Sequence, residues 1–240
     1  MTITFLGMNI NVNFIDPPFQ NTLTAPTTKK NNFSTGICPD DTIAKIENHD
    51  NSWRFAHNSN KIGQPATMTS VIDYANLVKG NYILFILESP HYWEYDKIEH
   101  TCLGPAQGET GIQTDSHLLE AINTSTVLSL KPELVYSIIF LNSVQYQASQ
   151  GEIPINDTGR DNNWRFFWNN GFNKDLLDRI NAFLKVDKDL IVVNCVTGGI
   201  DPNGLHLLVQ NYLVQNKIKN LHESNHPSSW GLNEENRKIW

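Results

Sequence analysis

The stretch Tyr82-Ile-Leu-Phe-Ile-Leu-Glu-Ser-Pro-His-Tyr-Trp-Glu94 contains six apolar residues that end abruptly at an acid, and a proline turn follows. A short apolar run of this kind is typical of a buried strand in a parallel sheet. Its end places the carboxylate of Glu88 where open α/β sheets build their sites. We therefore arrange the rest of the chain around this strand.

The chain after this strand repeats the same plan of an apolar run followed by polar residues. Further strands are predicted at 135–141, 190–193 and 218–222. Helices with an apolar face are predicted between them, at 116–122, 161–168, 174–184 and 205–216. Strands separated by helices form right-handed βαβ units. The predicted fold is a three-layer α/β/α domain around a central four-stranded parallel sheet.

The segment before the first predicted strand is less regular. Residues 1–40 are rich in proline and asparagine with little periodicity, which favours an N-terminal arm or coil. Residues 41–240 are expected to form a single α/β domain. Short helices are predicted at 40–47 and 67–78, packed on the sheet.

The composition narrows the class of protein. The chain has 240 residues, of which 40% are hydrophobic, with no apolar stretch long enough to span a membrane and no signal-like start. We expect a soluble, cytoplasmic, monomeric protein. Its three cysteines lack metal-site spacing, so no metal or other cofactor is expected. The net charge of −7 offers no overall attraction for a polyanion, so any nucleic-acid contact must come from a local surface.

Three side chains with complementary chemistry follow separate predicted strands. Glu88, Asn142 and His226 lie at strand ends or in the loops that follow, and a parallel sheet would bring them together. An amide can pair with a base edge, an acid can position water or stabilise a cation, and a histidine can donate to a developing anion. The alternatives are a solvated acid, a turn asparagine and a structural loop histidine. Trp164, Phe166, Phe167 and Trp168 are interpreted as core residues.

With these residues in place, the chain resembles the uracil-DNA glycosylase superfamily over about residues 80–232. Glu88-Ser-Pro-His, with Glu94 beyond it, is similar to the Glu-Ala-Pro-Gly motif of one branch. Gly104-Pro-Ala-Gln-Gly is similar to the Gly-Pro-Gly-Gln loop of the classical branch. Ile138-Ile-Phe-Leu-Asn-Ser-Val144 resembles Leu-Leu-Leu-Asn-Ala-Val, and His226-Pro-Ser-Ser-Trp230 resembles the closing His-Pro-Ser-Pro-Leu loop.

The resemblance implies a uracil-DNA-glycosylase-like fold and a role for each matched residue. The catalytic residues would be Glu88, Glu94 and His226, with the handling of water left open between the two acids because Ser89 replaces the usual aspartate. Base recognition would involve Asn142, His91, Tyr92 and Gln107. His91 stands where a tyrosine blocks the C5 position in uracil-specific enzymes, and Tyr92, Trp93 or Tyr95 would replace the missing stacking phenylalanine. The DNA-binding residues would be Ser89, Pro90, Ser228 and Ser229, which pinch the phosphates, and Trp230, which would act as the wedge.

The sequence thus predicts a monofunctional DNA glycosylase that flips a base out of the DNA and hydrolyses its N-glycosidic bond. Its substrate would be uracil, as in DNA repair, or a C5-modified pyrimidine such as a hypermodified phage cytosine, as in antiviral defence. One alternative is a non-catalytic nucleic-acid or nucleotide-binding module on the same scaffold. An unrelated α/β hydrolase or nucleosidase would need a nucleophile motif or a metal cluster, and the sequence shows neither.

Overall fold

The computed structural model describes residues 2–5, 8–11, 37–56, 62, 71–96, 101–148, 157–198 and 204–240. Near the N-terminus, β1 (Thr2–Phe5) and β2 (Met8–Asn11) form a separate antiparallel two-stranded sheet. Residues 1–40, predicted to form an N-terminal arm or coil, therefore include two short strands. The rest of the predicted arm up to residue 36 lies outside the described residues.

The main sheet has six strands in the order β4-β3-β6-β5-β7-β8. Their bounds are β3 Asp41–His49, β4 Ser52–Phe55, β5 Tyr82–Leu87, β6 Tyr136–Asn142, β7 Ile191–Asn194 and β8 Asn220–Glu223. The four predicted strands are present as the parallel set β6-β5-β7-β8. The α/β class is confirmed, but the predicted four-stranded parallel sheet of a uracil-DNA-glycosylase-like fold is wrong, because β3 and β4 add an antiparallel edge to a six-stranded mixed sheet.

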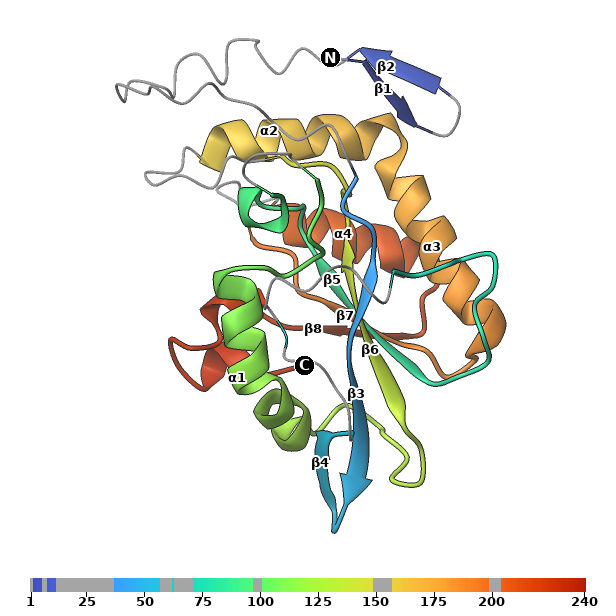
Figure 1. Ribbon diagram of the computed structural model, residues 1–240, viewed down its shortest axis with the longest axis vertical. Helices are drawn as coiled ribbons and strands as arrows, with labels where there is room; N and C mark the ends of the chain where they lie inside the picture. The colour runs from blue at the N-terminus through green and yellow to red at the C-terminus, as the bar shows by residue number, and fades with distance from the viewer. Residues whose placement is uncertain are drawn as a thin grey trace.

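Helices cover both faces of this sheet (Figure 1). They are α1 Glu109–Thr124, α2 Asp157–Phe167, the π-helical turn η2 Trp168–Phe172, α3 Asn173–Val186 and α4 Leu205–Gln215, with short 3-10 turns η1 Tyr92–Glu94, η3 Pro227–Ser229 and η4 Glu235–Arg237. Successive residues of a strand point to opposite faces. Phe85 therefore packs in the core under α1, whereas Leu84 and Ile86 pack in the core shared with α2, α3 and α4. All six residues of β5 are buried, as its apolar sequence predicts.

The helix predicted at 40–47 is wrong, because this segment is part of β3. Ala44 and Ile46 are buried while Lys45 between them is exposed, which is the alternation of a half-buried strand. A register shift between Thr42 and Ala44 interrupts that alternation and hides it in the sequence. The helix predicted at 67–78 is also wrong over its described residues 71–78, which form a bridge and turns. The predicted core aromatics Trp164, Phe167 and Trp168 are buried, whereas Phe166 is 40% exposed.

The main domain includes a few residues that had been predicted to belong to the arm. Asp40 is 1% exposed, and its carboxylate lies 2.6 Å from Nη1 of Arg179. The same carboxylate accepts hydrogen bonds from the hydroxyl of Tyr74 and from Nε2 of Gln145. Arg179 also donates through Nη2 to the carbonyl of Asn142, 3.0 Å away. This buried network fixes the end of β6.

We expect Asp40→Ala to lower the free energy of unfolding by about 3–5 kcal/mol, because it leaves the guanidinium of Arg179 buried without its main counter-ion. The matched control is Asp189→Ala. Its pair with Lys131 has the same 2.6 Å separation but lies at the surface, so it should cost about 0–1 kcal/mol. Urea unfolding of both variants measures the difference. Equal losses would show that the Asp40 network does not anchor the domain.

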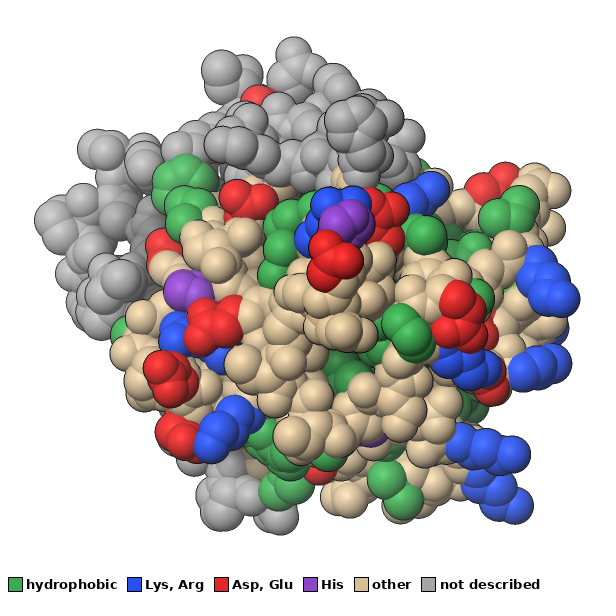
Figure 2. All heavy atoms as spheres, turned by 90° about the horizontal axis from the view of Figure 1, so that it is seen from below, with side chains coloured by type: hydrophobic (Ala, Val, Ile, Leu, Met, Phe, Trp, Pro, Cys, Tyr) green, Lys and Arg blue, Asp and Glu red, His purple; other side chains and the backbone are tan. Residues whose placement is uncertain are grey.

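No described helix is long and apolar enough to cross a membrane. Figure 2 shows one face of the molecule, on which basic side chains gather toward one edge and acidic side chains lie among them. No field of a single sign covers this face. Binding to a polyanion would therefore depend on local groups, in keeping with the net charge of −7.

Candidate active site

The register of the parallel strands brings the predicted site residues together. Leu87 of β5 is opposite Asn142 of β6, and the backbone N–H of Ser143 donates to the carbonyl of Leu87 over 2.8 Å. On the other side of β5, the N–H of Cys195 donates to the carbonyl of Ile86 over 2.9 Å. The strand order therefore sets the ends of β6, β5, β7 and β8 next to one another at one edge of the sheet.

A cavity of about 330 Å³ lies at this edge. This volume is within the range of small-molecule sites. The predicted residues that line it are Glu88, Ser89, His91, Glu94, Gln107, Asn142, His226 and Ser228. The cavity therefore unites side chains from four separate parts of the chain, as the sequence predicted.

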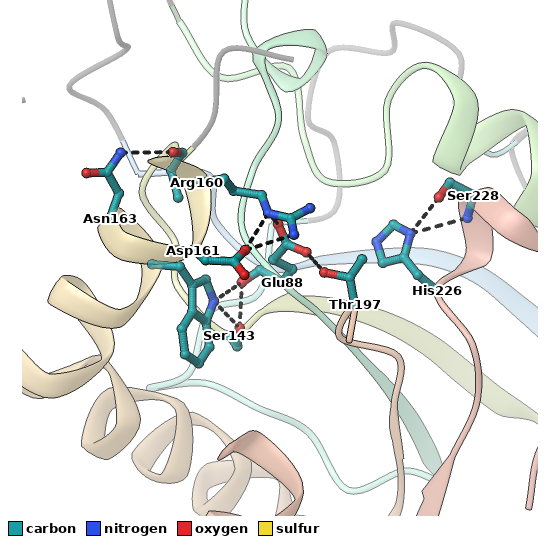
Figure 3. A network of polar contacts seen from close by, with 10 residues as sticks. Glu88, Ser143, Arg160, Asp161, Asn163, Thr197, His226 and Ser228 are labelled. Carbon is teal, nitrogen blue, oxygen red and sulfur yellow. Dashed lines mark hydrogen bonds and ion pairs between the residues drawn. The ribbon is translucent and has the colours of Figure 1, made fainter. Parts of the chain in front are cut away.

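Glu88 is held at the centre of a polar network (Figure 3). Its carboxylate lies 3.3 Å from Nε of Arg160 in α2 and accepts a hydrogen bond from the hydroxyl of Thr197 after β7. Its backbone carbonyl accepts hydrogen bonds from the hydroxyl of Ser143 and, over 3.0 Å, from Nε1 of Trp164. Glu88 is only 7% exposed, so it is not a solvated surface acid. The network gives its carboxylate one fixed position at the cavity wall.

The carboxyl of Glu94 lies in different surroundings from that of Glu88. Its carboxylate accepts the backbone N–H of His91 over 2.6 Å, which ties the ends of η1 together. Burial raises the pKa of Glu94 well above its ordinary value, and hydrogen bonds from backbone N–H groups oppose that shift only in part. A carboxyl with a raised pKa favours the protonated form and is a poor acceptor for a proton from water. Of the two acids left open by the sequence, Glu94 is therefore the less suited to accept a proton.

We expect Glu94→Gln to change the pH dependence of stability. Because the folded-state pKa of Glu94 is raised, its contribution to stability is complete below the unfolded value of about 4.5 and is lost as pH rises. The neutral amide has no such titration. The free energy of unfolding of Glu94→Gln relative to wild type should therefore rise above pH 4.5, by at most about 1.4 kcal/mol per pH unit. Urea unfolding at several pH values measures this, and a pH-independent difference would contradict it.

Asn142 presents an amide to the cavity. The residue is 2% exposed, and its Nδ2 is a buried nitrogen with no hydrogen-bond partner among the described residues. An unsatisfied buried donor costs about 1–3 kcal/mol. Asn194, at the corresponding end of β7, differs, because its Nδ2 donates to the His206 carbonyl and to Oε1 of Gln210, both over 3.1 Å. The amide of Asn142 therefore lacks the partners that the amide of Asn194 has.

His226 is held as a neutral donor. Its Nδ1 accepts the backbone N–H of Ser228 over 3.3 Å and lies 2.8 Å from the Ser228 hydroxyl. Burial, with help from the nearby charge of Arg160 and from His91, lowers the pKa of His226 to about 4. A neutral imidazole that accepts through Nδ1 carries its proton on Nε2. Figure 3 shows the ring beside Thr197 with one nitrogen turned toward Ser228, so the side chain has a second nitrogen for another partner.

The remaining predicted base contacts are placed as follows. His91 and Gln107 line the cavity, and the side chain of Tyr92 lies outside the described residues. Of the other two aromatic residues proposed to stack on the base, Tyr95 is buried away from the cavity lining, whereas Trp93 lines the cavity and is 45% exposed. Trp93 is therefore the aromatic residue placed to cover a ligand.

The predicted DNA-binding residues are only partly at the cavity. Ser89 and Ser228 line it. Pro90 is buried. Ser229 lines a second cavity of about 670 Å³ that adjoins the first and shares Thr197, His226 and Ser228 with it. The two cavities thus lie side by side at the ends of β5, β7 and β8.

The wedge assignment of Trp230 is wrong. This side chain is 0% exposed, and its ring packs edge-on against Phe85 of β5 with 6.2 Å between centroids. Its indole N–H donates to the carbonyl of Asn225 over 3.0 Å. A side chain fixed in the core has no access to a base stack. Leu232, two residues later, is 77% exposed on a turn closed by its N–H and the Ser229 carbonyl.

Sequence reasoning missed two residues of the network. Thr197 follows β7 in Asn194-Cys-Val-Thr-Gly-Gly199, and the strand-end rule that located Glu88 would have found it. Arg160 lies in a helix far from any strand end in the sequence, so no local signal marks it. Both residues line the cavity and contact Glu88.

Fold and cavity together define an α/β protein with a buried acid, an amide and a neutral histidine at the carboxyl edge of its sheet. No protein-family model, curated protein or solved structure matches the chain. Among the described residues, no group of three or more His, Cys, Asp or Glu side chains is arranged to hold a metal ion. Function must therefore be inferred from the site itself.

Proposed function

We propose that this protein is a monofunctional DNA glycosylase, a divergent member of the uracil-DNA glycosylase superfamily, that hydrolyses the N-glycosidic bond of a flipped base. The observation that carries the proposal is Asn142, which lines the cavity and whose buried Nδ2 has no hydrogen-bond partner among the described residues. A base edge offers ring nitrogens and carbonyl oxygens that accept such a donor. Binding of a base would satisfy the group that the free protein leaves unsatisfied.

The other two predicted groups suit the bond that breaks. Cleavage of the bond between C1′ and the base nitrogen sends both electrons to the base and leaves a cationic sugar. The carboxylate of Glu88 would stabilise that cation and take a proton from the attacking water, while Nε2–H of His226 would donate a hydrogen bond to the base. The proton from water finally reaches the base anion, so the products are an abasic site and a neutral free base.

Bases inside a duplex are inaccessible, so the target nucleotide must leave the stack. The cavities open beside Ser89, Ser228 and Ser229. The hydroxyl of Ser89 is suited to a phosphate oxygen, whereas the hydroxyls of Ser228 and Ser229 would have to turn from His226 to donate to phosphate. The exposed side chain of Leu232 lies on the turn that follows Ser229. We assign the wedge to Leu232, since an apolar side chain inserted in the stack keeps the flipped state open.

We expect Leu232→Ala to slow base release from a duplex about tenfold or more while changing release from single strands little, because only the duplex has a stack to hold open. The control is Trp230→Ala, which removes a core side chain. It should lower the free energy of unfolding by about 3–5 kcal/mol and affect both DNA forms alike. Equal losses on the two DNA forms for Leu232→Ala would remove the wedge role.

The substrate is proposed to be uracil or a pyrimidine with a larger C5 substituent. His91, at the place of the C5-blocking tyrosine, lines the cavity together with Trp93. Selectivity of such enzymes follows the shape of the pocket and its contacts to base substituents. A pocket open to C5-modified cytosines of phage DNA would make the protein a defence enzyme, whereas one restricted to uracil would make it a repair enzyme.

The experiment that tests the function is to incubate the purified protein with uracil-containing, unmodified and C5-hypermodified DNA and to identify the released bases by mass spectrometry. Release of free base from at least one modified or uracil-containing DNA supports the proposal. Efficient release of uracil alone would rule out the defence substrate. DNA or nucleotide binding with no base released from any DNA would favour the alternative, a non-catalytic binding module on this scaffold.

A further inference from the structure

The guanidinium of Arg160 reaches the cavity from α2 (Figure 3). Its Nη2 and Nε lie 2.8 and 2.9 Å from one carboxylate oxygen of Asp161, and its Nε lies 3.3 Å from the carboxylate of Glu88. The side chain is only 14% exposed. Two carboxylates, those of Asp161 and Glu88, thus hold the guanidinium at the cavity.

The charges around the cavity make Arg160 exceptional. Among the described residues that line it, Arg160 is the sole Lys or Arg. The two histidines add no positive charge near neutral pH, since burial and the charge of Arg160 lower the pKa of both His91 and His226. The positive charge among the described lining residues is therefore concentrated on one guanidinium, beside the carboxylates of Asp161 and Glu88.

A glycosylase needs positive charge at one moment in particular. When the bond from C1′ to the base nitrogen breaks, the electron pair goes to the base, and negative charge grows there. Neutral His226 can donate a hydrogen bond to that charge but brings no charge of its own. Fixed charges and dipoles aimed at a developing charge are usually the largest single contribution to catalysis.

We propose that Arg160 is a catalytic residue that stabilises the negative charge of the departing base. This inference rests on the proposed glycosylase function and adds a group that the sequence did not indicate. Arg160 forms no bond to the base, and it neither gains nor loses a proton, since a guanidinium stays charged at all relevant pH values. It lowers the energy of the base anion until the proton taken from water arrives.

If Arg160 served only as a counter-ion that positions Glu88, its replacement would slow the release of different bases equally. Comparing two bases of different acidity therefore distinguishes this positioning role from stabilisation of the departing base. Fluorine at C5 makes a pyrimidine a more acidic leaving group, so its anion needs less help. We expect Arg160→Gln to slow single-turnover release of uracil by about 10² or more. In the same DNA sequence, the factor by which the variant slows release of 5-fluorouracil should be about tenfold smaller than the factor for uracil. If cytosine is the base that wild type releases, cytosine and 5-fluorocytosine form the pair.

The matched control is Arg165→Gln, on the same helix but outside the cavity lining, which should leave both rates unchanged. Low millimolar guanidinium should restore part of the activity of Arg160→Ala. Equal slowing of both bases by Arg160→Gln would overturn the proposal and leave Arg160 a positioning residue for Glu88. Failure of wild type to release any base would instead contradict the proposed function.

A second measurement requires no turnover. We expect wild type to bind free 5-fluorouracil more tightly as pH rises and the base becomes an anion, and Arg160→Gln to lose that preference. Isothermal titration at two pH values, with DNA absent, gives both affinities. Equal affinity of wild type for the neutral and anionic base would overturn the role of Arg160, even if the protein releases no base from the DNAs tested.

Discussion

Glu88→Gln is expected to lower the single-turnover rate of base release by about 10² or more, the usual scale for an electrostatic or acid-base group. The amide keeps the size of the side chain, and its oxygen can still accept the hydroxyl of Thr197. What it loses is the negative charge that, in the proposed mechanism, stabilises the sugar cation and accepts the proton of water. DNA binding and the fold should be retained.

Glu94→Gln is the matched control for this experiment. The burial that raises the pKa of Glu94 favours a neutral carboxyl, which an amide imitates, so its rate should stay within a few-fold of wild type. Rapid-quench measurement of base release at a saturating protein concentration gives both rates. Full activity in Glu88→Gln together with loss in Glu94→Gln would transfer the water-handling role to Glu94.

Replacement of Asn142 has the second largest expected effect, and it concerns both the rate of base release and the stability of the protein. Asn142→Ala should slow base release by about 10² or more, because the base loses a preorganised hydrogen bond. It should leave the free energy of unfolding unchanged or higher, since Nδ2 is already unsatisfied in the free protein. Asn142→Asp, which replaces the donor by an acceptor, should change which base is released.

Asn194→Ala is the control for stability. Its amide donates to two partners and its Oδ1 accepts the N–H of Val196 over 3.2 Å, so removal should lower the free energy of unfolding by about 1–3 kcal/mol. Urea unfolding and base-release assays on both variants separate the two roles. A destabilised Asn142→Ala with an unchanged product profile would make Asn142 a structural turn residue.

The strands β5, β6 and β7 of the parallel set could be predicted from sequence because each is a largely apolar run. β5 is buried along its whole length, and its six consecutive apolar residues indicate a buried strand. β3 and β4 could not be predicted in the same way. Their residues are half-exposed and partly charged, and the pairing of β3 with β6 joins segments about a hundred residues apart. The local sequence of either strand does not indicate that the two strands pair.

The candidate site, like the sheet, could be predicted only in part. Glu88, Asn142 and His226 were found because strand ends in a parallel sheet converge, and the structure brings all three to one cavity. Trp230 was misplaced because the motif fixes the position of a residue along the chain but not the direction of its side chain, which packs under β5. Arg160 was missed because only the docking of α2 on the sheet brings it to Glu88.

The most direct test of the proposed chemistry is the number of abasic sites that wild type and Glu88→Gln form in uracil-containing and C5-modified DNA. We predict that wild type forms abasic sites in one of these DNAs, in a number equal to the free bases released and without strand cleavage, and that Glu88→Gln forms at least about a hundredfold fewer per unit time. Stable DNA binding by wild type without abasic sites in either DNA, or equal abasic-site formation by the two proteins, would contradict the proposed mechanism.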